Sequence, residues 1–121
     1  MSLVRTFRDL IAWQKGMALA KLVYAQTKLM PSDERFGLTN QMRRAAVSIP
    51  SNIAEGHARQ SRADYLRFLR AARGSLAELT TQAELAIEMG MLTDSQMELI
   101  AEEDRILQAL MRSLEAKEMS R

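Results

Sequence analysis

The stretch that decides the fold is LTNQMRRAAVSIPSNIAEGHA, which runs from Leu38 to Ala58. Apolar residues recur along it at helical spacing, and they are Leu38, Met42, Ala45, Ala46, Ile49 and Ile53. This spacing predicts one amphipathic helix whose apolar stripe faces a core. Pro50 lies inside the stretch, and an interior proline kinks or breaks a helix. Because the apolar phase continues from Ile49 to Ile53, we expect one helix kinked at Pro50. The alternative is a break, with Ser48 capping a new helix.

Three further segments of the chain show the same helical periodicity. We expect helices from about Asp9 to Met30, from the Ser61–Asp64 capping box to about Met89, and from the Thr93–Gln96 capping box to about Lys117. Asp9 is the expected N-cap of the first helix, and Gly90 is expected to end the third. Helices of this length joined by short turns predict an all-α fold. We expect an antiparallel up-down-up-down four-helix bundle that fills residues 1–121 as a single domain.

Composition narrows the class of protein. The chain has 121 residues, of which 47% are apolar and 26% charged, and it contains no cysteine. Disulfides and thiolate metal sites are therefore excluded. No apolar run approaches the ~20 residues of a membrane-spanning helix, and the first residues do not resemble a secretory signal. We expect a cytoplasmic protein without a membrane partner.

The residues of known catalytic patterns are missing from the sequence. His57 is the only histidine, and its place beside a helix-ending glycine is typical of a solvated loop residue. There is no Glu-x-x-His pair for a di-iron bundle, no glycine-rich phosphate loop and no nucleophile with an obvious paired base. We therefore expect no catalytic residue, no metal, no cofactor and no enzymatic activity.

Charge is segregated along the chain, although the net charge is only +2. Residues 40–75 carry seven arginines and two acids, whereas residues 76–104 carry eight acids and no base. Arginine presents a planar fork that suits phosphate, and a basic face attracts nucleic acid regardless of sequence. The alternative is that the two halves neutralise each other through ion pairs. The candidate nucleic-acid-binding residues are Arg43, Arg44, Arg59, Arg62, Arg67, Arg70 and Arg73.

The first helix has a second apolar stripe on a side away from the expected core. Its members are Ile11, Ala18, Leu22, Ala25 and Leu29. In the third helix, Gly74 belongs to a line of small residues off the core face, where another backbone could approach closely. A lone bundle would leave both features exposed, and contiguous apolar patches usually mark an interface. We therefore expect a homo-oligomer with Gly74 and the stripe in its subunit contact.

A polar cluster lies on one flank of the stripe in the second helix. It consists of Gln41, Ser48, Asn52 and Glu55. Buried polar groups need hydrogen-bond partners, so a network that braces the proline kink or a subunit contact is the favoured interpretation. A small polar pocket is the alternative.

Several of these segments together resemble one bacterial protein family. They are Gly37 to Gly56, Asp9-Leu10 with Trp13-Gln14-Lys15, the region of Tyr24, and Phe68-Leu69 with Ala72 to Glu78. They resemble the signature of the four-helix bundle family named for the 23S ribosomal RNA intervening sequence. The resemblance reaches to about Leu92, departs in the loop at Ala58, and extends to the fourth helix only in pattern.

The resemblance carries its own expectations of fold and assembly. It implies a four-helix bundle whose second helix continues through its proline. It also implies ring-like homopentamers, as in the related accessory variability proteins of diversity-generating retroelements. Those relatives are basic and are thought to bind nucleic acid and a reverse transcriptase. Two functional hypotheses follow: an oligomer that binds RNA or a nucleoprotein through its arginines, or a homo-oligomeric interaction scaffold with no nucleic-acid role.

Overall fold

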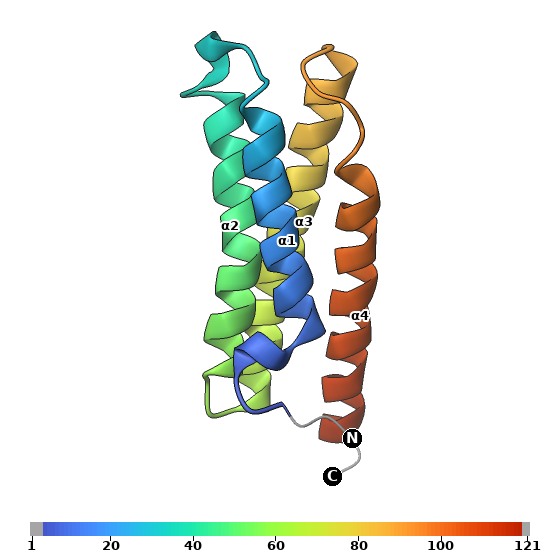
Figure 1. Ribbon diagram of the computed structural model, residues 1–121. Coiled ribbons are helices and arrows are strands. Elements are labelled where there is room, and N and C mark those ends of the chain that lie inside the picture. Colours follow the sequence, from blue (N-terminus) through green and yellow to red (C-terminus); the bar gives the residue numbers. More distant parts are fainter. Residues whose placement is uncertain (1–3, 120–121) are drawn as a thin grey trace.

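Helices make up most of the computed structural model, which describes residues 4–119 (Figure 1). The four α-helices are α1 (Ile11–Thr27), α2 (Leu38–His57), α3 (Arg62–Glu88) and α4 (Met97–Met119). Two short 3-10 helices, η1 (Phe7–Asp9) and η2 (Ser32–Glu34), precede α1 and α2. No strand occurs among the described residues. The all-α, four-helix fold predicted from the periodicity is confirmed.

The four helices stand side by side with their axes roughly along one direction. In Figure 1 the chain rises along α1, descends along α2, rises along α3 and descends along α4. Each helix packs against its neighbours in the sequence, and α4 closes the bundle against α1. Consequently α1 and α3 occupy opposite corners, and the α2–α3 turn lies at the lower end of the view.

The second helix passes through Pro50 without interruption, and Pro50 is itself buried. Proline has no N–H to offer the carbonyl of Ala46 one turn earlier. Nearby polar side chains bond to carbonyls around it: the Ser51 hydroxyl donates to Val47 O at 2.8 Å, and the Asn52 amide donates to Ser48 O at 2.7 Å. The continuous helix rules out a break at Ser48, whereas the bend at Pro50 stays a prediction.

All four helices contribute side chains to a single apolar core. The largest fully buried apolar side chains are Leu19, Val23, Met42, Ile49, Ile53, Leu66, Leu69, Leu76, Leu79 and Leu107. One ionisable side chain shares this interior, because Glu103 of α4 has no exposed surface. Opposite it on α1 lies Gly16, where an added Cβ would come within 2.9 Å of Glu103 Oε2. The glycine thus makes room for a buried carboxyl group.

The beginning of α1 differs from the sequence prediction. Asp9 does not cap α1. Instead its carboxylate accepts hydrogen bonds from the backbone N–H groups of Arg5 (2.8 Å) and Thr6 (3.1 Å), which close a capping box around η1. These two backbone bonds hold the pKa of Asp9 below its ordinary value. The helix itself begins after Leu10, with no side-chain cap.

The capping box expected at Thr93 is also wrong. The α4 helix begins only at Met97, and the Thr93 hydroxyl donates to Ser95 Oγ at 3.3 Å instead of to the helix. Gln96, which was to complete the box, is fully buried beneath the turn. Burial of this side chain moves the helix start further along the chain than local capping chemistry indicates. The other expected boundaries agree closely, and Gly90 adopts a positive φ of 74° after α3.

The two helices that carry most of the arginines pack very closely near their shared turn. A Cβ added at Gly56 of α2 would lie 2.7 Å from the Cβ of Phe68 and 3.3 Å from the carbonyl oxygen of Tyr65. Only glycine allows the two backbones to approach this far. This contact fixes the position of Phe68 relative to the end of α2.

Candidate nucleic-acid interface

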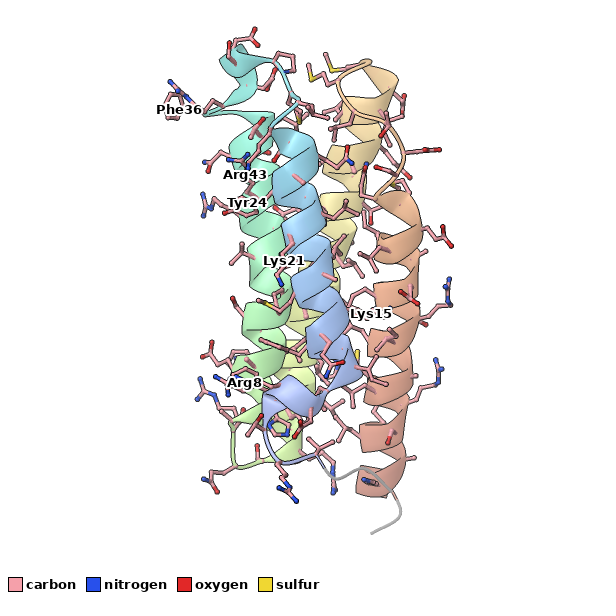
Figure 2. The ribbon with its side chains drawn as sticks, viewed as in Figure 1. Arg8, Lys15, Lys21, Tyr24, Phe36 and Arg43 are labelled. Atoms are coloured by element: carbon pink, nitrogen blue, oxygen red, sulfur yellow. The ribbon has the colours of Figure 1, made fainter. Side chains whose placement is uncertain are left out.

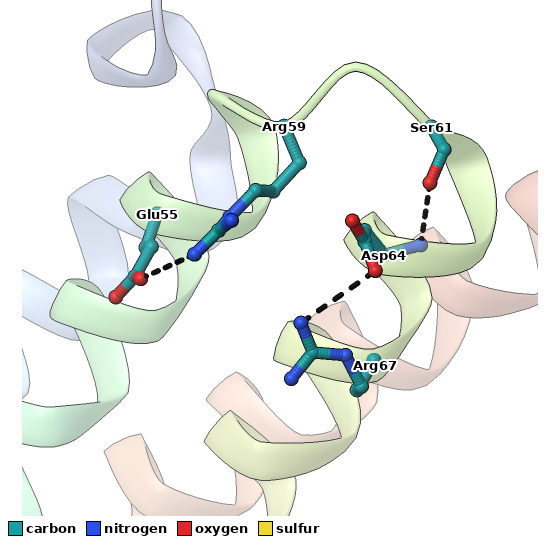
Figure 3. Close-up of polar contacts among 5 residues, drawn as sticks. All are labelled: Glu55, Arg59, Ser61, Asp64 and Arg67. Carbon is teal, nitrogen blue, oxygen red and sulfur yellow. Dashed lines mark hydrogen bonds and ion pairs between the residues drawn. The ribbon is translucent and has the colours of Figure 1, made fainter.

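The α2–α3 turn brings two arginines onto the same aromatic ring. Ser61 caps α3 by accepting a hydrogen bond from Asp64 N at 3.0 Å, which sets the direction in which the helix leaves the turn (Figure 3). The guanidinium carbon of Arg59 then lies 4.8 Å from the Phe68 ring centroid, and that of Arg67 lies 4.6 Å from it. Both distances fall within cation–π range. The half-buried ring therefore holds two guanidinium groups in place.

Each of these arginines also meets one acid on its own helix or turn. Arg59 Nη2 lies 2.8 Å from Glu55 Oε2, and Arg67 Nη2 lies 3.5 Å from Asp64 Oδ1 (Figure 3). The side chains of Arg59 and Arg67 are 43% and 63% exposed. A guanidinium has five N–H donors, so each group keeps donors that face solvent. The acids orient the arginines without using up their hydrogen-bonding capacity.

Charge at this end of the bundle is positive. Residues 55–70 contain four arginines against two acids. Arg8, which is not among the seven predicted arginines, lies at the same end (Figure 2). Its guanidinium carbon is 4.6 Å from the Phe7 ring centroid. Its place beside the α2–α3 turn follows from the packing of η1 against α2. We call Arg8, Arg59, Arg62, Arg67 and Phe68 the turn-end cluster.

Two of the predicted arginines are engaged by α4. Arg73 Nε lies 2.8 Å from Asp104 Oδ1, and Arg70 Nη2 lies 3.8 Å from Glu115 Oε1. These ion pairs join α3 to α4 across the bundle surface. Acids of α4 thus neutralise Arg70 and Arg73. This agrees with the alternative interpretation, in which the arginines form ion pairs within the chain.

The remaining two predicted arginines lie away from the turn, on the first half of α2. Arg43 donates from Nε to the Thr27 hydroxyl at 2.8 Å, and its guanidinium lies 4.7 Å from the Tyr24 ring centroid (Figure 2). It therefore ties α2 to α1. Arg44 is exposed and lines a polar pocket of about 480 Å³. The seven arginines thus form three groups, of which only the one near the turn shares a site.

The same pocket accounts for half of the polar cluster predicted on α2. Gln41 and Ser48 line it together with Ser75 and Glu78 of α3. Asn52 does not line it, because its amide turns back to a carbonyl of its own helix. Ser48 also donates to Ala45 O at 2.8 Å. The cluster therefore combines hydrogen bonds around the proline with a shallow pocket between α2 and α3.

The predicted second stripe of α1 lies on the surface of the bundle. Ile11 is 61% exposed and Leu29 is 77% exposed. Ala18 and Ala25 are exposed as well, whereas Leu22 is half-buried. Gly74 is equally open, since a Cβ added there would meet nothing within 4 Å. It lies beside a groove of about 630 Å³ between α3 and α4.

Within residues 4–119, no group of three or more histidine or acidic side chains is placed to hold a metal ion. None of the helices in the described part of the chain is both long and apolar enough to cross a membrane.

Sequence comparison gives the chain a family. No curated protein matches it. The sequence model of the 23S rRNA-intervening sequence protein family, in contrast, matches residues 8–113, which include η1, α1, α2, α3 and most of α4. The match extends the resemblance carried by the Gly37–Gly56 segment to nearly the whole chain. The chain therefore belongs to the 23S rRNA-intervening sequence protein family.

Proposed function

We propose that this protein is a non-enzymatic, homo-oligomeric module that binds RNA through its turn-end cluster. The observation that carries the proposal is the pair of exposed guanidinium groups, from Arg59 and Arg67, held on the Phe68 ring. The name of the family refers to intervening sequences of 23S rRNA, which supports RNA as the class of partner.

The cluster suits a phosphate backbone. Guanidinium groups offer paired N–H donors that match phosphate oxygens, and an arginine already stacked on an aromatic ring loses less conformational freedom on binding. Phosphate contacts carry no sequence information. Binding through Arg59 and Arg67 should therefore depend on charge and strand shape more than on base sequence.

The acids beside these arginines do not prevent such binding. Glu55 and Asp64 form exposed ion pairs with Arg59 and Arg67. Exposed pairs of this kind contribute only about 0.2–1 kcal/mol. A phosphate can therefore replace or share the carboxylate at small cost, while the acid keeps the arginine oriented in the free protein.

Self-association strengthens the proposal. The exposed stripe that includes Ile11 and Leu29 supports a subunit contact. The expectation of five subunits comes from the family resemblance alone. A ring repeats the turn-end cluster, so contacts along one RNA strand become intramolecular and gain avidity. The RNA partner and the cysteine-free sequence support a cytoplasmic location.

The test is a charge reversal at the cluster. Arg59→Glu/Arg67→Glu should abolish retention of RNA in a mobility-shift assay while the far-UV circular dichroism stays unchanged. The matched control is Arg35→Glu/Arg105→Glu, which makes the same change in net charge at two exposed positions outside the cluster. If both variants lose RNA equally, net charge and not the cluster causes binding, and the proposed site is wrong.

The second candidate function is a homo-oligomeric scaffold without a nucleic-acid role. The ion pairs Arg70–Glu115 and Arg73–Asp104 favour it, because they use arginine charge within the chain. Under this alternative, the wild-type protein assembles but retains no RNA even at low salt.

A further inference from the structure

An apolar groove runs along the surface where α1 lies against α2. Its volume is about 600 Å³. Tyr24 and Val47 within it remain 41% and 42% exposed. Its principal apolar lining residues are Trp13, Met17, Ala20, Tyr24, Val47 and Ala54. Contiguous exposed apolar surface of this kind marks a site of association.

The edge of the groove is positively charged. Lys21 of α1 and Lys28, directly after the end of that helix, line it, and α1 contains no acidic residue (Figure 2 shows Lys21). Among residues 4–119, neither lysine has an acidic side chain within ion-pair distance. A partner that fits the groove should therefore present an apolar ridge with acids beside it.

The outer face of α3 has this composition. Its exposed residues form a stripe of small side chains that ends in two large apolar ones, Leu85 (49% exposed) and Met89 (60% exposed). The small members are Gly74, Ala77 and Thr81. Small residues let another helix approach closely, and the larger ones can fill a groove.

Acidic residues accompany this stripe. Glu78, Glu84 and Glu88 are all exposed, and within the described part of the chain none of them is ion-paired. The apolar stripe and its acids extend from Gly74 to Met89. At the α-helical rise this is about 22 Å, the same length as the groove from Trp13 to Lys28.

We infer that the α1–α2 groove is the docking site for the outer face of α3 from a second copy of this chain. The inference deepens the proposed function, since it rests on self-association and names the two surfaces that meet. Of the predicted contact residues, Ala25 lines the groove and Gly74 lies on the α3 face, whereas Ile11 and Leu29 do not line the groove. Leu85 and Met89 enter the apolar groove, and Glu84 and Glu88 face Lys21 and Lys28. Complementary charge selects this pairing and fixes its register.

The arrangement of the bundle determines what this contact builds. α1 and α3 lie at opposite corners and run in the same direction, and both end at the upper end of Figure 1. With parallel bundle axes, Lys28 and Glu88 therefore meet at the same height. The two surfaces differ, so the contact is heterologous, and repeating it produces a closed ring when the rotation closes. Every α2–α3 turn then lies on one side of the ring.

Charge reversal tests the pairing through the molar mass measured by light scattering. Lys21→Glu/Lys28→Glu and Glu84→Lys/Glu88→Lys should each convert the assembly to monomers. The chain that carries all four changes should assemble again, because opposite charges face each other once more. Arg59→Glu/Arg67→Glu is the control for assembly. Both positions lie outside the contact, so this variant should lose RNA binding and remain assembled. Failure of the interface and failure of RNA binding are thus separate results.

Crosslinking provides a second measurement that does not depend on disrupting the contact. The chain has no cysteine, so Ala25→Cys and Thr81→Cys introduce the only thiols. With a short bismaleimide, the double variant should form covalent species larger than a dimer, whereas each single variant should not. A monomeric wild-type protein overturns the inference. The groove would then suit an acidic helix of another protein. Charge-reversed variants that remain assembled, or single-cysteine variants that crosslink as well as the double variant, overturn it too.

Discussion

Replacing Glu103 by glutamine is expected to change how the stability of the bundle depends on pH. Glu103 is fully buried between α4 and α1, and among the described residues neither carboxyl oxygen has a hydrogen-bond partner. Burial, together with the neighbouring Glu102, raises the pKa of Glu103 from 4.5 to about 8, and Lys15 opposes the shift. The folded protein therefore keeps this carboxyl protonated near neutral pH.

The sign of the effect follows from linkage. The folded-state pKa lies above the unfolded one, so the stability is fully present below about 4.5 and is lost as the pH rises to about 8. Each pH unit within this window costs about 1.4 kcal/mol, which gives about 5 kcal/mol over the whole window. Small domains have about 5–15 kcal/mol in total, so the bundle should weaken markedly at mildly alkaline pH.

The assay is urea unfolding followed by circular dichroism at matched protein concentration. Glu103→Gln keeps the shape of the side chain but cannot ionise. The two proteins should have similar stability near about pH 5, and the variant should be more stable by about 3 kcal/mol near about pH 7.5. The two proteins are identical at every other residue, so the difference between the two curves reports the substitution at Glu103.

The neighbouring residue supplies the control. Glu102 is 40% exposed and lies 3.3 Å from Lys15 Nζ, and an exposed pair contributes little to stability. Glu102→Gln should therefore keep most of the pH dependence of the wild-type protein, over a slightly narrower range because Glu102 contributes to the raised pKa of Glu103. Parallel curves for the wild-type protein and Glu103→Gln would contradict this prediction. They would mean that the pKa of Glu103 is the same in the folded and the unfolded protein.

Substitutions at three further positions test the packing and the capping of α3. Gly56→Ala should lower the melting temperature, because the added Cβ would lie 2.7 Å from Phe68. Such overpacking costs about 1–3 kcal/mol, which exceeds the helix-propensity gain of about 1 kcal/mol. An unchanged or higher melting temperature contradicts the close approach of α2 and α3. Ser61→Ala should lose about 1 kcal/mol in urea unfolding by removing the cap on Asp64 N, and Ser61→Asp should retain it. Gly74→Ala has open space in the single chain and should stabilise the isolated bundle by about 1 kcal/mol, measured in the monomeric Lys21→Glu/Lys28→Glu background. In the wild-type background, the added methyl group should weaken assembly.

Much of the fold can be predicted from the sequence because helical periodicity is strong in α2 and α3. The stripe from Met42 to Ile53 lies in the core as expected, and α2 continues through Pro50. The start of α4 could not be predicted in this way. Local capping chemistry favoured Thr93, but tertiary packing buries Gln96 and delays the helix.

The site was predicted less completely, since a one-dimensional pattern does not show which charges meet. Arg70 and Arg73 find acids on α4, far along the chain. Nothing in the sequence indicates that Arg59, beyond the helix boundary, shares the Phe68 ring with Arg67. The acidic run from residue 76 to 104 does not single out Glu103, because its burial depends on Gly16 of another helix.

The salt dependence of RNA binding by the wild-type protein tests the central claim most directly. Each phosphate neutralised by an arginine releases a condensed counterion, so the logarithm of the binding constant should fall linearly with the logarithm of salt concentration between about 50 and 200 mM. Fluorescence anisotropy with labelled RNAs of unrelated sequence measures this. RNAs of every sequence should give the same steep dependence of binding on salt concentration. The Arg59→Ala/Arg67→Ala variant should give a shallower one. An affinity that does not depend on salt, or no binding at the lowest salt concentration, would contradict the claim.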